Sequence, residues 1–593
     1  MSAIATSPPG AGDSRRIPGW LVAVIVVLGT VIYAPGLTAK LTHYDDSLYI
    51  YANPALEKRG LDGLLYQWDG DRSWSGNFVE FFPLRDSVYW AIYQVWETEG
   101  TPYHVASLLF HLLATVLVFV LTVRLVPSRE VAIVTTLIFL VHPIHIESVL
   151  WAAGLKDPMY TSFMLGSLVA YLNAREGRAW WYAISLVLLV ASLLVKSMAI
   201  STPLLMLAIE LFGGQRDTWR RIAARLSAPA ITSALFLLQF ILIGKANRAV
   251  VGPHGGSWAA HVVLSSWAQV KYLRQAFFPA SFRLIYCFEP PAGLADWRFF
   301  VALAVAAALI AVAVLWRRHP LRLLAGAWYF ACLLPVSNLV PFPAVMADRY
   351  LYAASFGACL LIALLLERLA PSPARLAALL IVVGLSATTF TRSFVWQDAD
   401  QLWAEPDSDP ACIVDGSAPA AQSHILRSWT AKDAKTRLAA IERAVATPGL
   451  FKLNRLHFCE MLNEGAIEVS LHGHPERGRP WAKLAVQNCR DFPRTWVAVT
   501  ITNLHTYPVI AARAAAKAYR LEPSTALKAM WGLTAIEAGE SAGFRLVSEA
   551  IAEDPGVSCG QLGQWAKEVD PALQTSIQAL LADCATRGYS LPP

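Results

Sequence analysis

The sequence WLVAVIVVLGTVIYAP at residues 20–35 decides the fold, because it is an apolar run without a charged residue. A helix of roughly 17 to 25 apolar residues crosses a bilayer, and this run reaches that length when Gly19 and Gly36 are added. Two adjacent carboxylates, Asp45 and Asp46, follow a few residues later. Acidic residues beside the hydrocarbon are costly and are usually retained for function. The pair therefore marks either a functional site at the membrane surface or a solvated loop.

The same apolar run could instead belong to a secretory signal peptide, since Arg15 and Arg16 precede it. Many equally apolar runs follow along the chain, and no convincing small-residue cleavage site stands out. A first span that is retained in the mature protein is therefore the preferred interpretation.

The composition of the whole chain is that of a membrane protein. Of its 593 residues, 55% are hydrophobic and 16% are charged, and the mean hydropathy is +0.44. Soluble domains carry roughly 25% charged residues. The chain has 21 tryptophans, 19 tyrosines and 25 phenylalanines, enough to supply aromatic belts at both membrane surfaces. These figures argue against a soluble protein.

The apolar runs predict about eleven membrane-spanning helices, and the arginines predict their orientation. When residues 1–18 are placed in the cytoplasm, arginines fall in this tail and in the alternate short connections, as the positive-inside rule requires. The net charge of +6 therefore reflects topology, and nucleic acid is not an expected partner. The predicted spans lie near residues 19–36, 103–125, 130–148, 158–174, 180–196, 198–212, 228–244, 297–316, 321–340, 350–368 and 373–392.

This orientation places the polar motifs on the side opposite the cytoplasm. That side receives the external loop 37–102, the segment 142–157, Lys196, the loop 245–296 and the segment 348–350. An enzyme with an extracytoplasmic active site would show such segregation. A transporter more often has its polar groups near the midplane of interrupted helices.

No apolar span follows the last predicted one, so residues 394–593 are expected to form a helical domain outside the cytoplasm. Similar short motifs that end on Pro448, Pro493, Pro523 and Pro555 recur there at intervals near the roughly 34 residues of tetratricopeptide (TPR) repeats. Stacked helical hairpins of this kind leave a concave face that suits extended chains. The alternative is an irregular helical cap without a ligand.

Most of the cysteines lie in this C-terminal region. An oxidising compartment would allow disulfides there, and the scattered spacing without CxxC argues against a zinc site. The spacing agrees with two bridges and one remaining thiol, or with a third bridge that includes Cys287 of the second external loop. The C-terminal cysteines are Cys412, Cys459, Cys489, Cys559 and Cys584.

Asp45 and Asp46 have the residue type of a general base or a cation ligand. A carboxylate at the bilayer surface can take the proton of an acceptor hydroxyl as that hydroxyl attacks. Adjacent side chains point in different directions, so we expect one of the pair to be the base and the other to orient the site or bind a cation. A solvated acidic loop is the alternative.

Four basic residues on the same side of the membrane could hold a lipid-linked phosphate. Lys156, Lys196 and Arg349 lie at span ends, and Arg85 lies in the external loop. Charge-assisted hydrogen bonds from such residues stabilise the negative charge on a phosphate leaving group. Each of them could instead be a cation that extends its charge to the membrane interface.

His142, His145 and Glu147 form an HxxHxE motif at a span end. They are expected to form a polar hydrogen-bonded network. A divalent cation is the alternative, although this spacing does not place three ligands on one face of a helix. No other cofactor is expected.

The motifs together resemble the TMTC-type family. Its members are GT-C glycosyltransferases, transmembrane O-mannosyltransferases that carry TPR repeats at their C-terminal end. The resemblance covers roughly residues 20–405, and the combination of motifs is more specific than any one of them. The motifs are Tyr44–Asp46, Phe82–Arg85, Tyr103-His104, Leu108–His111, His142–Val149, Leu194–Lys196, Asp348–Tyr352, Trp396–Asp398 and Leu402-Trp403.

The resemblance implies an all-α integral membrane protein with a GT-C type bundle over residues 19–393 and a TPR-like C-terminal domain. It also implies a polyprenyl-phosphate sugar donor, an inverting transfer, and Asp45 or Asp46 as the general base. The chain departs from the family in the order of residues in Phe82–Arg85 and in the spacing around Lys156. Its repeats are few and diverged, so neither mannose nor a particular acceptor is carried over.

The hypothesis from the sequence is a hexosyl- or pentosyltransferase that moves one sugar to a secreted protein or pilin held near the TPR-like domain. The high alanine and arginine content favours a bacterium, with undecaprenyl phosphate as carrier. The protein would then lie in the inner membrane, with its active site and residues 394–593 in the periplasm. Transfer to a lipid or a surface polysaccharide is a near alternative. A polyprenol-lipid flippase or an assembly scaffold is the non-enzymatic alternative.

Overall fold

The structure, a computed structural model, consists of two compact units, residues 1–415 and 416–593. Its described residues form helices and no strand, which confirms the all-α prediction. The predicted cytoplasmic tail lies almost wholly outside the described residues. These are residues 16–42, 44–51, 53–69, 81–213, 217–246, 252–341, 344–415, 418–447, 455–567, 569 and 571–589.

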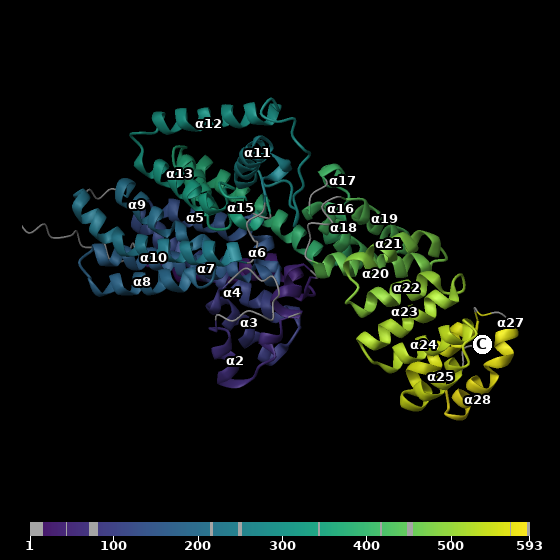
Figure 1. Cartoon of the computed structure of the whole chain (residues 1–593). Helices are drawn as coiled ribbons and strands as arrows, with labels where there is room; N and C mark the ends of the chain where they lie inside the picture. The colour runs from purple at the N-terminus through teal and green to yellow at the C-terminus, as the bar shows by residue number, and fades with distance from the viewer. Residues whose placement is uncertain are drawn as a thin grey trace, which may run out of the picture. The chain divides into compact units, whose positions relative to one another are not determined.

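Within the described part of the chain, five helices are long and apolar enough to cross a membrane. They are α1 (Gly19–Tyr33), α4 (Gly100–Leu125), α10 (Trp219–Ala246), α12 (Trp297–Leu315) and α15 (Pro371–Ser393) (Figure 1). Half of the apolar window of α4 is buried, against 11% for α10, α12 and α15. Helix α4 is therefore central, whereas the other three present apolar side chains outward. Lipid suits such a surface, because exposing it to water is unfavourable.

One predicted span is bent. Helix α5 (Arg129–Val141) is followed by η5 (Pro143–His145) and α6 (Ile146–Leu150), and the two halves differ in direction by 46°. The proline has no backbone N–H to continue the helix. Instead, His142 Nδ1 accepts a hydrogen bond from the Ile144 N–H (3.2 Å). Counted as one span, this pair raises the number of candidate spans among the described residues to six.

The remaining predicted spans correspond to helices that are shorter or more polar. They are α7 (Lys156–Arg175), α8 (Trp180–Leu193), α9 (Thr202–Phe212), α13 (Pro320–Leu333) and α14 (Ser355–Leu366). None of these meets the length and hydropathy of a span by itself. The membrane character is confirmed, and the number eleven stays a prediction.

Both segments predicted as external loops contain helices. The first holds η2 (Ser47–Tyr51), α2 (Gly60–Tyr66) and α3 (Pro83–Trp96). The second holds α11 (Trp258–Phe277), which lies beside α12 near the top of Figure 1. These helices fix the polar residues of the external segments in place, which a free loop would not do.

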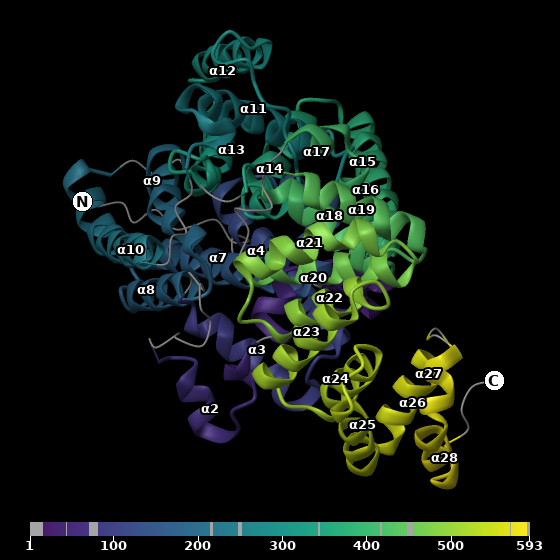
Figure 2. The ribbon, with the colours of Figure 1, turned by 45° about the vertical axis from the view of Figure 1, so that its right-hand side comes forward.

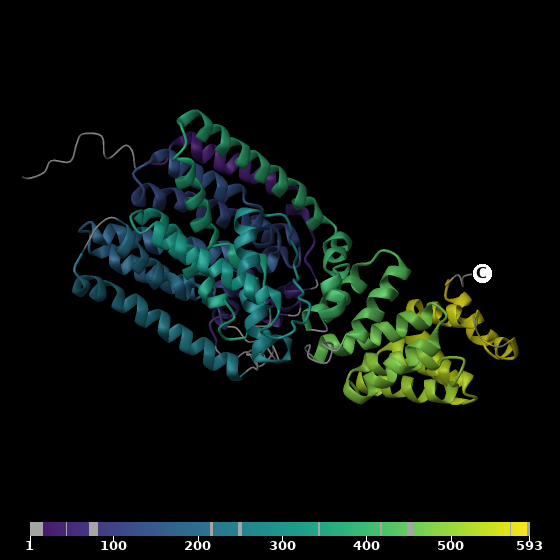
Figure 3. The same cartoon turned by 90° about the horizontal axis from the view of Figure 1, so that it is seen from above.

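The first and last apolar helices of the first unit lie side by side, α1 in purple and α15 in green in Figure 3. The Ser393 hydroxyl of α15 donates a hydrogen bond to the Ile32 carbonyl of α1 (2.9 Å). The unit then continues through α16 (Ala399–Asp407) to Asp415, whereas the predicted domain boundary follows residue 393 directly.

The second unit is a row of antiparallel helices (Figure 2). They include α18 (Ala418–Thr430), α19 (Ala434–Ala446), α20 (Arg455–Leu471), α21 (Pro475–Asn488), α22 (Pro493–Asn503), α23 (Pro508–Leu521), α24 (Thr525–Glu537), α25 (Ala542–Glu553), α26 (Pro555–Ala566) and α28 (Gln578–Thr586). Helices α21, α23 and α25 end shortly before Pro493, Pro523 and Pro555, as the repeated motifs predict. Pro448 of the first motif lies outside the described residues. Assignment of this row as TPR-like stays a prediction.

The chain forms three disulfides. Of the two predicted arrangements, the one with a third bridge that includes Cys287 is therefore correct. The disulfides join Cys287 to Cys412, Cys459 to Cys489 and Cys559 to Cys584. The first lies in the first unit and the other two join helices of the second. The remaining cysteines, Cys332 and Cys359, are buried free thiols in α13 and α14.

Candidate active site

Asp46 is held by three hydrogen bonds in the loop that follows α1. Its Oδ2 accepts bonds from the Thr42 N–H (2.7 Å) and the Thr42 hydroxyl (2.9 Å), and its Oδ1 accepts one from the Ala153 N–H (2.8 Å). The side chain is fully buried. Asp46 therefore anchors the first loop to η6 (Ala152–Leu155), which precedes α7.

The environment of Asp46 has opposing effects on its ionisation. Burial raises the pKa of Asp46 to about 7, and the hydrogen bonds from Thr42 and Ala153 act in the opposite direction. A carboxyl group fixed by three donors has little freedom to approach a substrate. Both oxygens of Asp46 are already engaged by these donors.

Asp45 is different, because its side chain is only half-buried. Among the described residues, none forms a hydrogen bond or an ion pair with it. Burial by itself would lower the pKa of the Arg349 guanidinium. The negative charges of Glu147 and, more weakly, of Asp45 act in the opposite direction, and the net effect is a raised pKa. Asp45 thus lies within electrostatic reach of Arg349 and keeps its oxygens available to a substrate.

Trp151 lies close both to the aspartate loop and to two predicted phosphate-binding residues. It is fully buried, and its Nε1 donates a hydrogen bond to Thr42 Oγ1 (3.1 Å). Tyr44 stacks on its ring with 5.5 Å between centroids. The Arg349 guanidinium lies 5.1 Å and the Lys156 ammonium 6.0 Å from the centre of the same ring. Trp151 therefore joins the aspartate loop to two of the predicted phosphate-binding residues.

Arg349 forms a buried ion pair with Glu147. One guanidinium nitrogen contacts Glu147 Oε1, and the Arg349 backbone N–H donates to Glu147 Oε2 (3.0 Å). The guanidinium also lies 5.2 Å from the Tyr350 ring centre. Glu147, predicted from the sequence to belong to a polar network, is thus the counter-ion of Arg349, a predicted phosphate-binding residue.

The two predicted lysines have unequal partners. Lys196 forms an ion pair with Asp157, and both side chains are nearly or fully buried. Lys156 is 6% exposed and donates a hydrogen bond to the Tyr49 hydroxyl (3.0 Å). In the described part of the chain, no carboxylate forms an ion pair with Lys156. Lys156 is therefore a buried cation held only by a neutral group.

Arg85, like Lys156, lies close to the Tyr49 ring. Its Nε contacts Asp86 Oδ1 (2.8 Å), and its guanidinium lies 4.6 Å from the Tyr49 ring centre and 5.1 Å from that of Phe82. Tyr49 thus brings Arg85 and Lys156 to one place. Arg85 is fully buried, so it is not a surface residue that extends its charge to the interface.

His142 and His145 have separate partners rather than a common one. His142 Nε2 lies 3.2 Å from the Ala276 carbonyl oxygen, and His145 Nε2 lies 2.8 Å from the Ser355 hydroxyl. Within the described residues no side-chain hydrogen bond joins His142, His145 and Glu147 to one another, so their polar network stays a prediction. The described residues contain no group of three or more histidine, cysteine, aspartate or glutamate side chains that could hold a metal ion. The alternative of a cation at His142, His145 and Glu147 also stays a prediction.

Sequence reasoning assigned no role to Asp348, which the structure places beside Glu147. Its Oδ1 accepts hydrogen bonds from the Tyr286 hydroxyl (2.8 Å) and Gln275 Nε2 (3.5 Å). Burial and the nearby charge of Glu147 raise the pKa of Asp348 above its usual range. The partners are more than sixty residues away in sequence, so no local pattern indicated them.

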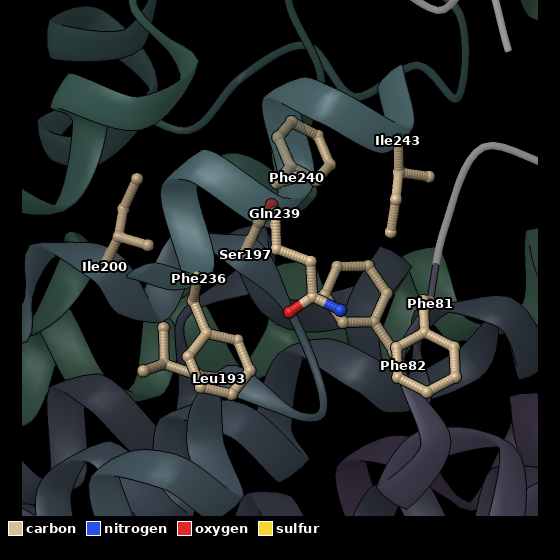
Figure 4. Close-up of a pocket in the computed structure, with 9 residues that line it drawn as sticks. All are labelled: Phe81, Phe82, Leu193, Ser197, Ile200, Phe236, Gln239, Phe240 and Ile243. Atoms are coloured by element: carbon tan, nitrogen blue, oxygen red, sulfur yellow. The ribbon is translucent and has the colours of Figure 1, made fainter. Parts of the chain in front are cut away.

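Two pockets flank these residues. The first encloses about 330 Å³, including the space at its mouth (Figure 4). Its walls are mainly apolar side chains from α8, η7 (Ser197–Ser201), α10 and the segment before α3. The lining residues are Phe81, Phe82, Leu193, Ser197, Ile200, Phe236, Gln239, Phe240 and Ile243. Phe82 touches Arg85, and Leu193 and Ser197 flank Lys196 in sequence, so this apolar pocket begins beside the basic residues.

The second pocket encloses about 350 Å³, again including the space at its mouth. Glu147 and Asp348 line one wall, the loop 282–284 a second, and Arg392 with α16 a third. It therefore borders the Glu147–Arg349 pair through Glu147.

Curated relatives share part of this sequence. A protein O-mannosyl-transferase of Caenorhabditis elegans is 28% identical over 178 residues, 29% of this chain and 25% of its own length. The protein O-mannosyl-transferase Tmtc1 of Drosophila melanogaster is 32% identical over 30% of this chain and 21% of its own length. The protein O-mannosyl-transferase TMTC3 of Homo sapiens is 25% identical over 26% of this chain and 17% of its own length.

The similarity is therefore partial, since this chain spans a quarter or less of the length of each of these relatives. No family profile matches the chain, and no solved structure matches it. Over somewhat less than a third of its length, the chain is similar to protein O-mannosyl-transferases, which confirms the TMTC-type resemblance that its motifs predict.

Proposed function

We propose that this protein is a membrane glycosyltransferase that moves one sugar from a polyprenyl-phosphate carrier to a hydroxyl group of a protein. The observation that carries the proposal is the unequal environment of the two aspartates. Asp46 is fixed by three hydrogen bonds, whereas the neighbouring Asp45 carboxylate has no bonded partner in the described chain. The names of the relatives, all protein O-mannosyl-transferases, support the same reaction class.

In the proposed reaction the acceptor oxygen attacks the anomeric carbon of the sugar. A carbon–oxygen bond forms there as the bond from that carbon to the phosphate oxygen breaks, so the configuration inverts. The acceptor proton passes to Asp45, and the bonding electron pair leaves with the polyprenyl phosphate. A positioned general base contributes about 10²- to 10⁴-fold to such a step.

The donor phosphate is proposed to lie at Lys156, with Lys196, Arg349 and Arg85 around it. Lys156 has no carboxylate partner in the described chain, so a phosphate would supply its counter-charge. A buried charge without a counter-ion is unfavourable, which favours an anion at this place. The apolar pocket beside these residues is proposed to receive the first isoprene units of the carrier, because its side chains are mostly aromatic and aliphatic (Figure 4).

The proposed compartment is the periplasm of a bacterium, with the protein in the inner membrane. Disulfides persist in oxidising compartments and are rare in the cytosol. All three bridges lie in segments that the arginine pattern assigns to the extracytoplasmic side. The helical row of the second unit is proposed to hold the acceptor protein, since stacked helical hairpins can form extended binding faces.

The test compares cells that express the wild-type chain with cells that express Asp45→Asn at an equal level. Glycopeptides and lipid-linked sugars are measured by mass spectrometry. A glycopeptide that requires the wild-type chain and disappears with Asp45→Asn is expected. Equal glycopeptides in both strains, or a change confined to glycolipid or surface polysaccharide, would overturn the proposal of a protein acceptor.

A further inference from the structure

The second pocket has no role in the reaction described so far. A series of contacts links this pocket to the proposed donor site. Lys156 and Arg349 both lie near the Trp151 ring, and Arg349 is paired with Glu147, which lines the pocket. The second pocket is therefore connected to the proposed donor site through the Arg349–Glu147 pair. A pocket adjoining that site can hold part of the acceptor whose hydroxyl attacks the sugar.

The walls of the second pocket are held together by covalent and ionic bonds. The loop 282–284 is joined to the segment after α16 by the Cys287–Cys412 disulfide and by an ion pair between Arg283 and Asp409. Arg392 also donates a hydrogen bond to the Phe282 carbonyl (3.3 Å). A pocket with fixed walls does not have to be ordered when its ligand binds, which favours affinity.

The charges of the second pocket leave one carboxyl group without a cation. Glu147 is paired with Arg349, and Glu405 is paired with Arg392 (3.0 Å). Asp348 has no ion pair within the described residues. Its hydrogen bonds come from neutral groups, namely the Tyr286 hydroxyl, the Gln275 amide and the Arg283 backbone. The other lining side chains include Ile144, Ile146, Leu284, Trp396 and Leu402. Apolar walls with one unpaired carboxyl group suit a lysine, whose methylene stem is apolar and whose end is cationic.

We propose that the second pocket binds a positively charged side chain of the acceptor protein, close in sequence to the hydroxyl that receives the sugar, with Asp348 as its counter-ion. The proposal rests on the proposed transferase function and adds a selection rule for its acceptor. Burial and Glu147 raise the pKa of Asp348 to about 8. A bound ammonium group would lower this pKa again and hold the carboxylate in its ionised form. The resulting ion pair would be screened little by solvent, because it is buried.

The test uses the full-length chain in lipid nanodiscs that contain polyprenyl phosphate. Short peptides with one central serine carry lysine, glutamine or glutamate at each neighbouring position in turn. Binding of fluorescent peptides is measured by anisotropy, which needs no catalysis, and transfer is measured with a polyprenyl-phosphate hexose. Asp348→Asn is compared with Glu289→Gln, a matched control that removes an exposed carboxylate from the same external segment.

We expect a lysine peptide to bind about tenfold or more tightly than its glutamine counterpart, which is the effect of one charge-assisted contact. Asp348→Asn should bring this ratio to about one, and Glu289→Gln should leave it unchanged. A ratio that survives Asp348→Asn, or an absence of any lysine preference, would overturn the proposal. Weaker donor binding by Asp348→Asn with an unchanged peptide ratio would also overturn it, since the pocket would then hold the sugar. A lysine preference in binding without transfer to any peptide would refute the transferase function but support the pocket.

Discussion

Replacing Asp45 by asparagine tests the proposed mechanism most directly, because it removes a charge without removing a structural contact. The side chain is half-buried, and no hydrogen bond or ion pair to it is formed in the described residues. We therefore expect Asp45→Asn to fold and insert normally. The same change at Asp46 should behave differently, because both of its oxygens accept bonds from backbone N–H groups.

The magnitudes follow from these contacts. Loss of a general base lowers kcat by about 10²- to 10⁴-fold, which corresponds to about 3–5 kcal/mol of transition-state stabilisation. Asp45→Asn should show this loss with little change in unfolding temperature. In Asp46→Asn the new amide group faces the N–H of Thr42 or Ala153. Each buried donor that loses its acceptor costs about 1–3 kcal/mol, so this variant should lose stability.

The assay is transfer from a polyprenyl-phosphate hexose by purified full-length protein, together with thermal unfolding in the same detergent. Asp62→Asn is the control, since Asp62 is an exposed carboxylate in the same external segment. If Asp45→Asn retains more than a tenth of wild-type kcat while Asp46→Asn is folded and inactive, Asp46 is the base and our assignment is wrong. If both variants are stable and fully active, neither aspartate is the base.

Three further predictions concern the buried charges. Lys156→Gln should raise the KM for the donor about 10- to 100-fold, as expected for a lost charge-assisted contact. Lys196→Gln should raise this KM less, because a carboxylate already neutralises Lys196. Equal effects of the two substitutions would contradict this order. Arg349→Gln leaves Glu147 buried without its partner and should destabilise the protein by about 3–5 kcal/mol, measured by denaturant unfolding. Because the pKa of Asp46 is raised to about 7, its contribution to stability should be greatest below about pH 4 and be lost as the pH rises through 7. Thermal unfolding at several pH values should show this slope in the wild type and a smaller one in Asp46→Asn.

The helical class and the order of the apolar segments could be predicted because hydropathy is a local property of the chain. The run at residues 20–35 became α1, and the run near 103–125 became α4. Helix α11 was not predicted, because its apolar residues alternate with polar ones and no continuous run marks it. The bend at Pro143 was not predicted either, although proline gave a local signal for it.

The site was only partly predictable, because its partners are distant in sequence. Both aspartates could be named from their position after the first span. Their separate roles depend on Ala153, which donates to Asp46 across 107 residues, and on the Glu147–Arg349 pair, which spans 202 residues. A single sequence carries no signal for such pairs, so neither the base nor the counter-ions could be assigned from it.

The pairing of charges connects the two proposed roles. Arg85, Lys196 and Arg349 each contact a carboxylate, so their charges are already balanced when no substrate is bound. Of the four proposed phosphate-binding residues, Lys156 is the one without an ion pair in the described chain, and of the two adjacent aspartates Asp45 is the one that accepts no hydrogen bond there. An inverting sugar transfer needs one cation for the departing phosphate and one carboxylate for the acceptor proton. The proposed site thus keeps one cation for the departing phosphate and one carboxylate for the acceptor proton. Lys156 lies 6.0 Å from the centre of the Trp151 ring, and Tyr44, the residue before Asp45, stacks on the same ring.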